Sequence, residues 1–425
     1  MEINKIKNST ISLLCVVLLF GCSDENGESN NRIEDDNPIK TVNLSDQSRS
    51  ISLQLLDFYP TVTSDIAEFI DSKVYQSGNF VVSPLSLSMS LAMISNAVED
   101  ELQQEILSYL GVENLDVMNE LSSTFLTDLP GLDKKTEMTF ANSVWVEDSR
   151  EVNDDFTNLV NDFYYCDIDY FSWKNPQKGV TQINDWISNK TNGKFNDYIN
   201  DDKLNGIMAL LINVLSFKSE WSYPNFFEES NTKNRIFYGY NETRDVPTME
   251  SSEKMLNCYF DEYFTYVMVP FGNHAYMFEI LLPTSEIPID FNSDIMKKQL
   301  SIGRSSKMEY KKVTLQLPKF KMDFEVRLNE VLKKAGIEHF DVCQLKLFTE
   351  NEIGAISVRQ KVLFEINEKG AEATVTSSSS FGVTATRPDY SVNDPIRINV
   401  DHPFMFFITE QSTGAVVVSG RVTDL

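Results

Sequence analysis

Histidine and cysteine, the side chains that most often bind metals or act in catalysis, are few in this chain and far apart. The three histidines, His274, His339 and His402, belong to no HExxH motif and to no paired-cysteine arrangement, so the sequence predicts no zinc site. The chain also lacks a GxSxG motif, and no serine, histidine and acid form a recognisable catalytic triad. We therefore expect a protein that is not an enzyme and that needs no metal or cofactor.

The most unusual segment of the chain is residues 371–393, "AEATVTSSSSFGVTATRPDYSVN", which is rich in Ser, Thr, Ala and Val. It is longer than the ~12–15 residues beyond which structureless connections are usually functional or disordered. Its first part, residues 371–376, alternates small and β-branched residues without Pro or Gly, so no bulky side chain would stop it from joining a sheet. These residues fit a loop and a strand equally well.

The rest of the chain predicts an α+β protein that positions this segment. Helical patterns such as "PLSLSMSLAMISNAV" from Pro84 come first, and strand patterns such as "IMALLINVLSF" from Ile207 and "ISVRQKVLFEI" from Ile356 dominate afterwards. The composition, 42% hydrophobic and 24% charged, is that of a globular protein. No repeat or linker divides residues 51–425, which we expect to form a single large unit.

The charge of the chain restricts its partners. The chain has 37 basic and 63 acidic residues, a formal net charge of −26 at pH 7. This charge repels the phosphates of nucleic acids and of anionic lipid surfaces. We therefore expect no nucleic-acid partner.

The N-terminal segment is typical of an export signal. Lys5 and Lys7 precede the apolar run "ISLLCVVLLFGC", which is too short to span a membrane. The run ends in LFGC, which resembles the lipobox of bacterial lipoproteins, although Phe20 is bulkier than the usual residue. We expect residues 1–21 to be a signal peptide and Cys22 to carry a lipid; the alternative is an ordinary secretory signal in which Cys22 is incidental.

Residues 22–50 are acidic and polar, and we expect them to be a flexible tether. The sequence SDE at 23–25 resembles the surface-export signal of Bacteroidetes lipoproteins, which predicts an exported protein at the outer-membrane cell surface or outside the cell. A periplasmic orientation stays open. The lipid would then be the only contact with a membrane. The remaining cysteines, Cys166, Cys258 and Cys343, are odd in number and predict no disulfide framework.

Several segments of the chain resemble the serpin family in their order and spacing. They are "NFVVSPLSLSMSLAMISNAVEDELQQEIL" from Asn79, "LLINVLSFKSEWSYPNFF" from Leu210, "LPKFKMDFEVRLNEVLKKAGI" from Leu317, "FEINEKGAEATVTS" from Phe364 and "DHPFMFFITEQSTGAVVVSGRV" from Asp401. The resemblance covers nearly the whole chain from residue 52. It implies a fold with a large central β-sheet, two smaller sheets and surrounding helices, and an exposed reactive loop within residues 368–393.

The resemblance also implies a function. A serpin inhibits a target serine or cysteine protease as a suicide substrate: the protease cleaves the reactive loop and forms an acyl-enzyme, and the loop inserts into the central sheet before the acyl group is released. Such a protein is expected to be a monomer. The alternative is a serpin-fold surface lipoprotein that serves as a protease substrate or binding protein without inhibiting.

The family's hinge, the base of the inserting loop, matches residues in the segment from Glu368 onwards. Gly370 tolerates both backbone states, and the residues after it are small enough to enter a sheet. Ala371 departs from the Thr or Ser that usually follows the hinge glycine. The matching residues are Glu368, Lys369, Gly370, Ala371, Ala373 and Thr374.

Other positions match the family's shutter, under the middle of the central sheet, and its breach, where the loop first enters. Ser83, Ser86 and Asn184 match the shutter, where Gln360 replaces a histidine that is common in the family. Trp221 matches the breach tryptophan. We expect Glu368 to form an ion pair with Lys319 beside it.

The bond that a protease would cleave follows from the family's usual loop length counted from Gly370. This places the cleaved bond at Thr384–Ala385, preceded by Val383, and such small residues suit elastase-like or subtilisin-like proteases. Two alternatives stay open. Arg387 would attract trypsin-like enzymes, although the following Pro388 hinders cleavage, and Phe381 would attract chymotrypsin-like enzymes.

Overall fold

The computed structural model describes residues 37–73, 78–191, 193, 199–200, 204, 206–284, 297, 300–301, 305, 307–350, 352–372 and 394–425. All of them belong to one compact unit, Asn37–Leu425. The predicted signal peptide and the predicted lipid anchor Cys22 lie outside the described residues. No described helix is both long and apolar enough to cross a membrane.

The folded part of the chain begins earlier than the sequence analysis predicts. The tether is expected to reach residue 50, but helix α1 begins at Asp46, and Val42 and Leu44 before it are buried in the main core. These two apolar residues stand in an otherwise polar stretch, which is why composition alone assigns them to the tether. The described part of the folded unit therefore includes residues 37–50 of the predicted tether.

Helices and strands follow the order expected of an α+β chain, with most helices before β4. The helix α2 is buried along its whole length; it begins with Pro84 after Ser83, whose side chain accepts a hydrogen bond from the Ser86 amide at 3.2 Å. The α-helices are α1 (Asp46–Lys73), α2 (Pro84–Ala97), α3 (Asp100–Leu110), α4 (Leu115–Asp128), α5 (Asp154–Tyr164), α6 (Pro176–Lys190) and α8 (Leu328–Lys334).

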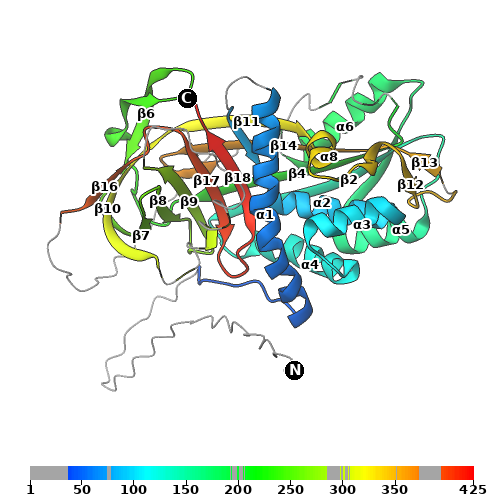
Figure 1. Ribbon diagram of the computed structural model, residues 1–425, viewed down its shortest axis with the longest axis horizontal. Coiled ribbons are helices and arrows are strands. Elements are labelled where there is room, and N and C mark those ends of the chain that lie inside the picture. The colour runs from blue at the N-terminus through cyan, green and yellow to red at the C-terminus, as the bar shows by residue number, and fades with distance from the viewer. Residues whose placement is uncertain are drawn as a thin grey trace, which may run out of the picture. The chain divides into compact units, whose positions relative to one another are not determined.

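A six-stranded sheet occupies the middle of the unit. In Figure 1 the labels of its strands β14, β4 and β2 lie close together, above those of the helices α2 and α3. In spatial order the strands are β11 (Phe320–Arg327), β14 (Ile356–Asn367), β15 (Gly370–Glu372), β4 (Ala209–Glu220), β2 (Thr136–Glu147) and β3 (Cys166–Phe171).

The strand β4 is buried on both faces, because its alternate residues belong to two different cores. Leu211 and Leu215 are part of the main core with α2, whereas Leu210 and Ile212 belong to a second core with Ile183 of α6. Burial on both sides explains why the sequence of β4 is an almost continuous apolar run. A polar residue within such a run therefore needs a specific partner.

A ten-stranded sheet forms the second large layer of strands. The strand β10 pairs with β7 through residues 309–313 and with β6 through residues 316–318, so the two smaller sheets that the resemblance implies are continuous here. The strands are β1 (Phe80–Val82), β18 (Val416–Val422), β17 (Phe404–Glu410), β9 (Tyr276–Pro283), β8 (Phe264–Pro270), β7 (Lys254–Phe260), β10 (Glu309–Pro318), β6 (Thr243–Glu250) and β5 (Lys233–Tyr238), with β16 (Ile396–Asn399) on the other edge of β10. A separate hairpin pairs β12 (Cys343–Leu345) with β13 (Glu352–Gly354).

Candidate functional site

The two central strands of the six-stranded sheet are joined directly over only half of their length. Residues 209–214 of β4 pair with residues 356–361 of β14 in parallel. Towards the other end, the short strand β15 lies between them, and its Ala371 pairs with Ser219 of β4 and with Ile366 of β14. We call β15 with residues 215–220 and 362–367 the insertion site.

Gly370 begins β15 in a conformation that requires glycine. Its φ angle is 144°, which residues with a side chain rarely adopt. A Cβ atom at this position would lie 2.0 Å from the carbonyl oxygen of Ser219 and 2.9 Å from the Cα of Glu220. The predicted hinge glycine is therefore the residue that lets the chain turn closely against β4, and the buried Ala371 follows it into the sheet.

Trp221 holds the turn that leads into β15. Its backbone amide donates a hydrogen bond to the carbonyl of Lys369 at 3.0 Å, and its indole Nε1 donates to the carbonyl of Asn367 at 3.0 Å. The buried indole stacks on Phe271 with ring centroids 4.8 Å apart. The tryptophan predicted for the breach thus lies directly beside the hinge.

Glu368 and Lys319 form the predicted ion pair. The ammonium of Lys319 lies 2.8 Å from one carboxylate oxygen of Glu368 and 3.0 Å from the other, and the hydroxyl of Thr232 donates to the carboxylate at 2.7 Å. Only 9% of the Glu368 side chain is exposed. Burial alone would raise the pKa of Glu368, but the hydrogen bonds from Lys319 and Thr232 outweigh it and hold the pKa below its ordinary value.

The shutter residues Ser83 and Gln360 are bonded to each other beneath the sheet. The Ser83 amide donates to the side-chain oxygen of Gln360 at 2.8 Å, and the side-chain nitrogen of Gln360 donates to the Ser83 carbonyl at 3.0 Å. An amide side chain can do both at once and does not titrate. In this chain the contact between α2 and β14 therefore carries no titratable group of its own.

The structure corrects the prediction for Asn184. This residue lies on α6, where its side chain donates to the carbonyl of Ile199 at 3.0 Å and accepts from the Ile199 amide at 2.9 Å. The asparagine beside Gln360 is Asn213 of β4, which pairs with it in the ladder and donates to the side-chain oxygen of Asn142 at 2.7 Å. The sequence feature that could have identified Asn213 is its position as a polar residue within an otherwise apolar strand.

Two buried polar atoms near this point have no hydrogen-bond partner among the described residues: Asn213 Oδ1 and Ser86 Oγ. An unsatisfied buried polar group costs about 1–3 kcal/mol. The closed pairing of β4 with β14 therefore leaves hydrogen-bonding capacity unused in the middle of the sheet.

The predicted residues of the reactive loop lie beyond the part of the chain that the structure describes. Two hinge residues and the whole region of the cleaved bond lie outside the described residues, namely Ala373, Thr374, Phe381, Val383, Thr384, Ala385 and Arg387. The segment that contains them, 373–393, is attached at both ends: β15 precedes it, and β16, which pairs with β10 in parallel, follows it.

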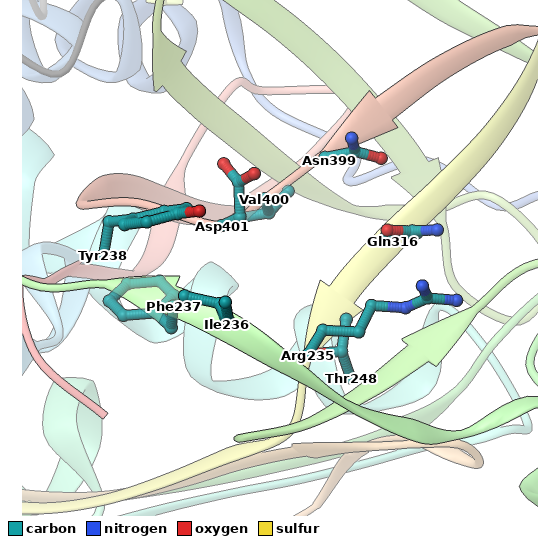
Figure 2. Close-up of a pocket in the computed structure, with 9 residues that line it drawn as sticks. All are labelled: Arg235, Ile236, Phe237, Tyr238, Thr248, Gln316, Asn399, Val400 and Asp401. Atoms are coloured by element: carbon teal, nitrogen blue, oxygen red, sulfur yellow. The ribbon is translucent and has the colours of Figure 1, made fainter. Parts of the chain in front are cut away.

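A polar pocket of about 230 Å³ lies beside the end of β16 (Figure 2). It is lined by Arg235, Ile236, Phe237, Tyr238, Thr248, Gln316, Asn399, Val400 and Asp401. Two of the lining residues share a partner: the carboxylate of Glu250 accepts hydrogen bonds from Arg235 at 2.5 Å and from Gln316 at 2.7 Å. These contacts join β5, β6 and β10, and β16 pairs with β10.

The cysteines of the described residues are buried, and these residues form no metal-binding cluster. Cys166, Cys258 and Cys343 are buried, and burial raises the pKa of the Cys258 thiol to about 12. No group of three or more His, Cys, Asp or Glu side chains in the described part of the chain could hold a metal ion. The distinctive feature of this region is the short strand β15 between two strands that pair directly with each other elsewhere.

The ion pair of Glu368 predicts a dependence of stability on pH. Because the folded-state pKa lies below the ordinary value of about 4.3, the pair stabilises the folded state at neutral pH, and this contribution disappears as the pH falls through the folded-state pKa. We expect Lys319→Met to lower the urea midpoint at pH 7 and to have a progressively smaller effect below pH ~4. The measurement is urea unfolding of the wild type and of Lys319→Met at several pH values between 7 and 3, which gives the difference between their urea midpoints.

The matched control is Lys321→Met, two residues further along the chain, in β11. Its ammonium lies 3.6 Å from Glu365, both side chains are more exposed, and such surface pairs contribute little. A difference between wild type and Lys319→Met that stays constant from pH 7 to pH 3 would contradict the assignment to Glu368.

Comparison with known proteins identifies this arrangement of strands. Residues 62–425 match the family model described as "Serpin (serine protease inhibitor)". Serine protease inhibitor 2 of Anopheles gambiae is 27% identical over 373 residues, covering 82% of this chain and 87% of that protein, and serine protease inhibitor 42Dd of Drosophila melanogaster is 29% identical over 362 residues, covering 83% and 93%.

The crystal structure of Serpin48 from the insect Tenebrio molitor superposes with a TM-score of 0.75 at 22% identity, covering 90% of this chain and all of that one. The predicted α+β fold with its large central sheet is thereby confirmed. The family match extends over most of the chain and includes both strands of the insertion site and the hinge between them. The chain belongs to the serpin family.

Proposed function

We propose that this protein inhibits an endopeptidase of the serine or cysteine class as a suicide substrate, through insertion of residues after Glu372 between β4 and β14. The protease nucleophile would attack a carbonyl carbon of the reactive loop. An ester or thioester forms there, and the amine of the next residue leaves as a new N-terminus. Insertion then has to outpace attack of water on the acyl group.

The observation that carries this proposal is the position of β15. Ala371 already pairs with both flanking strands, so the start of an inserted strand is present in the uncleaved chain. The small residues after it extend the same pattern. A loop that never inserted would need neither Gly370 packed against β4 nor a buried Ala371.

The register of β15 assigns each later residue to a row of the sheet. Because β15 is antiparallel to both neighbours, every step forward along it is one step back along β4 and β14. Six steps from Ala371 lead to Ser377, six steps from Ser219 lead to Asn213, and six steps from Ile366 lead to Gln360. Without a bulge, Ser377 therefore enters between the two shutter residues.

This register divides insertion into two stages. Residues 373–375 would enter rows where the described ladder has no direct β4 to β14 pairing. Residue 376 would be the first to replace such a pair, Val214 with Lys361. Each replaced parallel pair gives way to two antiparallel ones, which are slightly more stable per residue.

Insertion of Ser377 would also give a hydrogen-bond partner to one unsatisfied atom at the shutter. Directly paired residues in a sheet point to the same face, so the Ser377 hydroxyl would lie on the side of Asn213 Oδ1, which has no partner among the described residues. A hydroxyl donor there would satisfy it. The gain from new hydrogen bonds and added strand area would supply the free energy that distorts the bound protease.

For the cleaved bond we propose Thr384–Ala385, with elastase-like or subtilisin-like targets. The length of the loop supports this position, and the small side chains support this class of protease. Arg387 followed by Pro388, and Phe381, are the alternatives that sequencing of the products would reveal.

Trapping predicts a covalent complex. We expect the chain from residue 37, mixed with elastase-, subtilisin-, trypsin-, chymotrypsin- and papain-like proteases, to form with at least one of them a band at the summed mass on a denaturing gel. Mass spectrometry of the released C-terminal fragment should show that it begins at Ala385. If every protease cleaves the loop and stays active, the protein is a serpin-fold substrate and not an inhibitor.

The register predicts opposite effects for two neighbouring arginine substitutions. By the same count, Ala373 enters between the buried Phe217 and Phe364, so Ala373→Arg would bury a charge and block insertion. We expect this variant to be cleaved without trapping. The measurement is the fraction of cleaved inhibitor that remains bound to protease.

The matched control is Glu372→Arg. The register sets position 372 in the row of Glu365, one step before the two phenylalanines, and the sequence already has a charged residue there, so we expect trapping close to that of the wild type. Equal loss of trapping in both variants would show that the register deduced from β15 is wrong.

We further propose that residues 1–21 are a signal peptide and that the exported protein is a monomer held at the outer-membrane cell surface, or otherwise outside the cell, by a lipid on Cys22. The apolar run, the motif that ends at Cys22 and the acidic residues after it support this. We expect radioactive palmitate fed to the producing bacterium to label the protein. Cys22→Ser should abolish labelling and the control Cys15→Ser should not; labelled Cys22→Ser protein would refute the anchor.

A further inference from the structure

The segment before α1, residues 37–44, is fastened across turns that belong to both large sheets. We call it the N-terminal strap. In Figure 1 this dark blue segment passes the turn between β17 and β18 before it reaches α1. Its hydrogen bonds join Asn37 to Asp133 and Lys134, the carbonyl of Pro38 to Asn273, Lys40 to the carbonyl of Gly131, and the amide of Val42 to Ser412.

Asp133 is the most deeply buried partner of the strap, with 2% of its surface exposed. Its Oδ1 accepts from the side-chain nitrogen of Asn37 at 2.7 Å and from the amide of Lys135 at 3.0 Å, and its Oδ2 accepts from the hydroxyl of Thr136 at 2.8 Å. The backbone of Gly272 is so close that a Cβ atom there would lie 1.7 Å from Oδ2. The carboxylate therefore sits in a closely fitted site.

From Asp133 a line of hydroxyl groups leads to the insertion site. The Thr136 and Ser219 hydroxyl oxygens are 2.7 Å apart and both are buried. A carboxylate only accepts hydrogen bonds, so the single proton of the Thr136 hydroxyl points to Asp133. Ser219 must then be the donor to Thr136, and Ser219 is the residue of β4 that pairs with Ala371.

We propose that Asn37 of the strap and Asp133 are positioning residues for loop insertion, which act through Thr136 on Ser219 and so on the docking of β15. This inference rests on the proposed inhibitory function. The strap fixes the Asp133 carboxylate, the carboxylate sets the direction of the hydroxyl line, and the line holds the end of β4 against β2. A firmly held β4 presents Ser219 in the place that the incoming strand needs. Without the strap, β15 docks more weakly, insertion is slower, and more inhibitor is cleaved without trapping.

The test uses three substitutions, each of which changes one hydrogen-bonded contact between Asn37 and Ser219, and leaves the other contacts of the strap in place. Asn37→Ala removes the contact from the strap to the carboxylate. Thr136→Val keeps the shape of threonine but removes the hydroxyl. In Asp133→Asn, both donors at Oδ1 require the amide oxygen there, so the amide nitrogen takes the place of Oδ2, donates to Thr136 and reverses the line.

Two controls separate positioning from general damage. Thr136→Ser keeps the hydroxyl and should behave as the wild type. Lys40→Ala removes another strap contact, an exposed one to the Gly131 carbonyl, without touching the line. The readouts are the ratio of trapped to cleaved inhibitor, measured well below the unfolding temperature, and hydrogen exchange of the backbone amides at residues 370–372 in the uncleaved protein.

We expect the ratio of trapped to cleaved inhibitor to fall about fivefold in Asn37→Ala and Thr136→Val, the rate change that the loss of one ordinary hydrogen bond produces. It should fall in Asp133→Asn too, because the reversed line leaves the proton of the buried Ser219 hydroxyl without Thr136 as its acceptor. Exchange at residues 370–372 should quicken in the same three variants and in neither control. Combining Asn37→Ala with Thr136→Val should add little, because the line is already broken.

The failure of this inference is distinguishable from failure of the proposed function. If the wild type traps protease and the three variants trap it equally well, the line does not position the insertion site. If the wild type traps no protease, the inhibitory function is wrong, and the exchange measurement then decides the inference alone: unchanged exchange at residues 370–372 would overturn it.

Discussion

The direct pairing of β4 with β14 is the contact on which the rest of the structure depends. Both strands are twelve residues long, yet they are joined over residues 209–214 and 356–361 only, and β15 enters from the other end. The helices α2 and α6 cover opposite faces of β4 and exclude water from both. A change of the strand paired along the edge of β4 would leave these covered faces in place. Both faces of β4 are therefore buried, although β4 and β14 pair directly over only half of their length.

Local contacts decide where a new strand begins. Gly370 turns the chain against β4, the indole of Trp221 holds the preceding turn, and the ion pair of Glu368 with Lys319 fixes that turn to β11 and the neighbouring strands. None of these contacts is large by itself. Together they set the register, and the register assigns every later residue to its row.

The sequence allowed much of this to be predicted, and the limits have physical causes. Gly370, Trp221 and the ion pair of Glu368 lie in continuous motifs, so neighbouring residues identify them. The choice of Asn184 was wrong because several asparagines stand in similar text, and only the strand pairing shows which one faces Gln360. The line from Asp133 to Ser219 was not predicted at all, since its members come from separate segments and meet only through the pairing of β2 with β4.

The uneven pairing of β4 and β14 has a consequence for how the molecule would be used. Each residue from 376 to 381 added to β15 would replace one direct pair of β4 with β14 by two new pairs, so each of these steps would be harder to reverse than to take. Insertion of the strand would then be effectively irreversible and would need no energy source such as a nucleotide. One chain would then disable one protease, and the number of chains present, not a turnover rate, would set the capacity for defence.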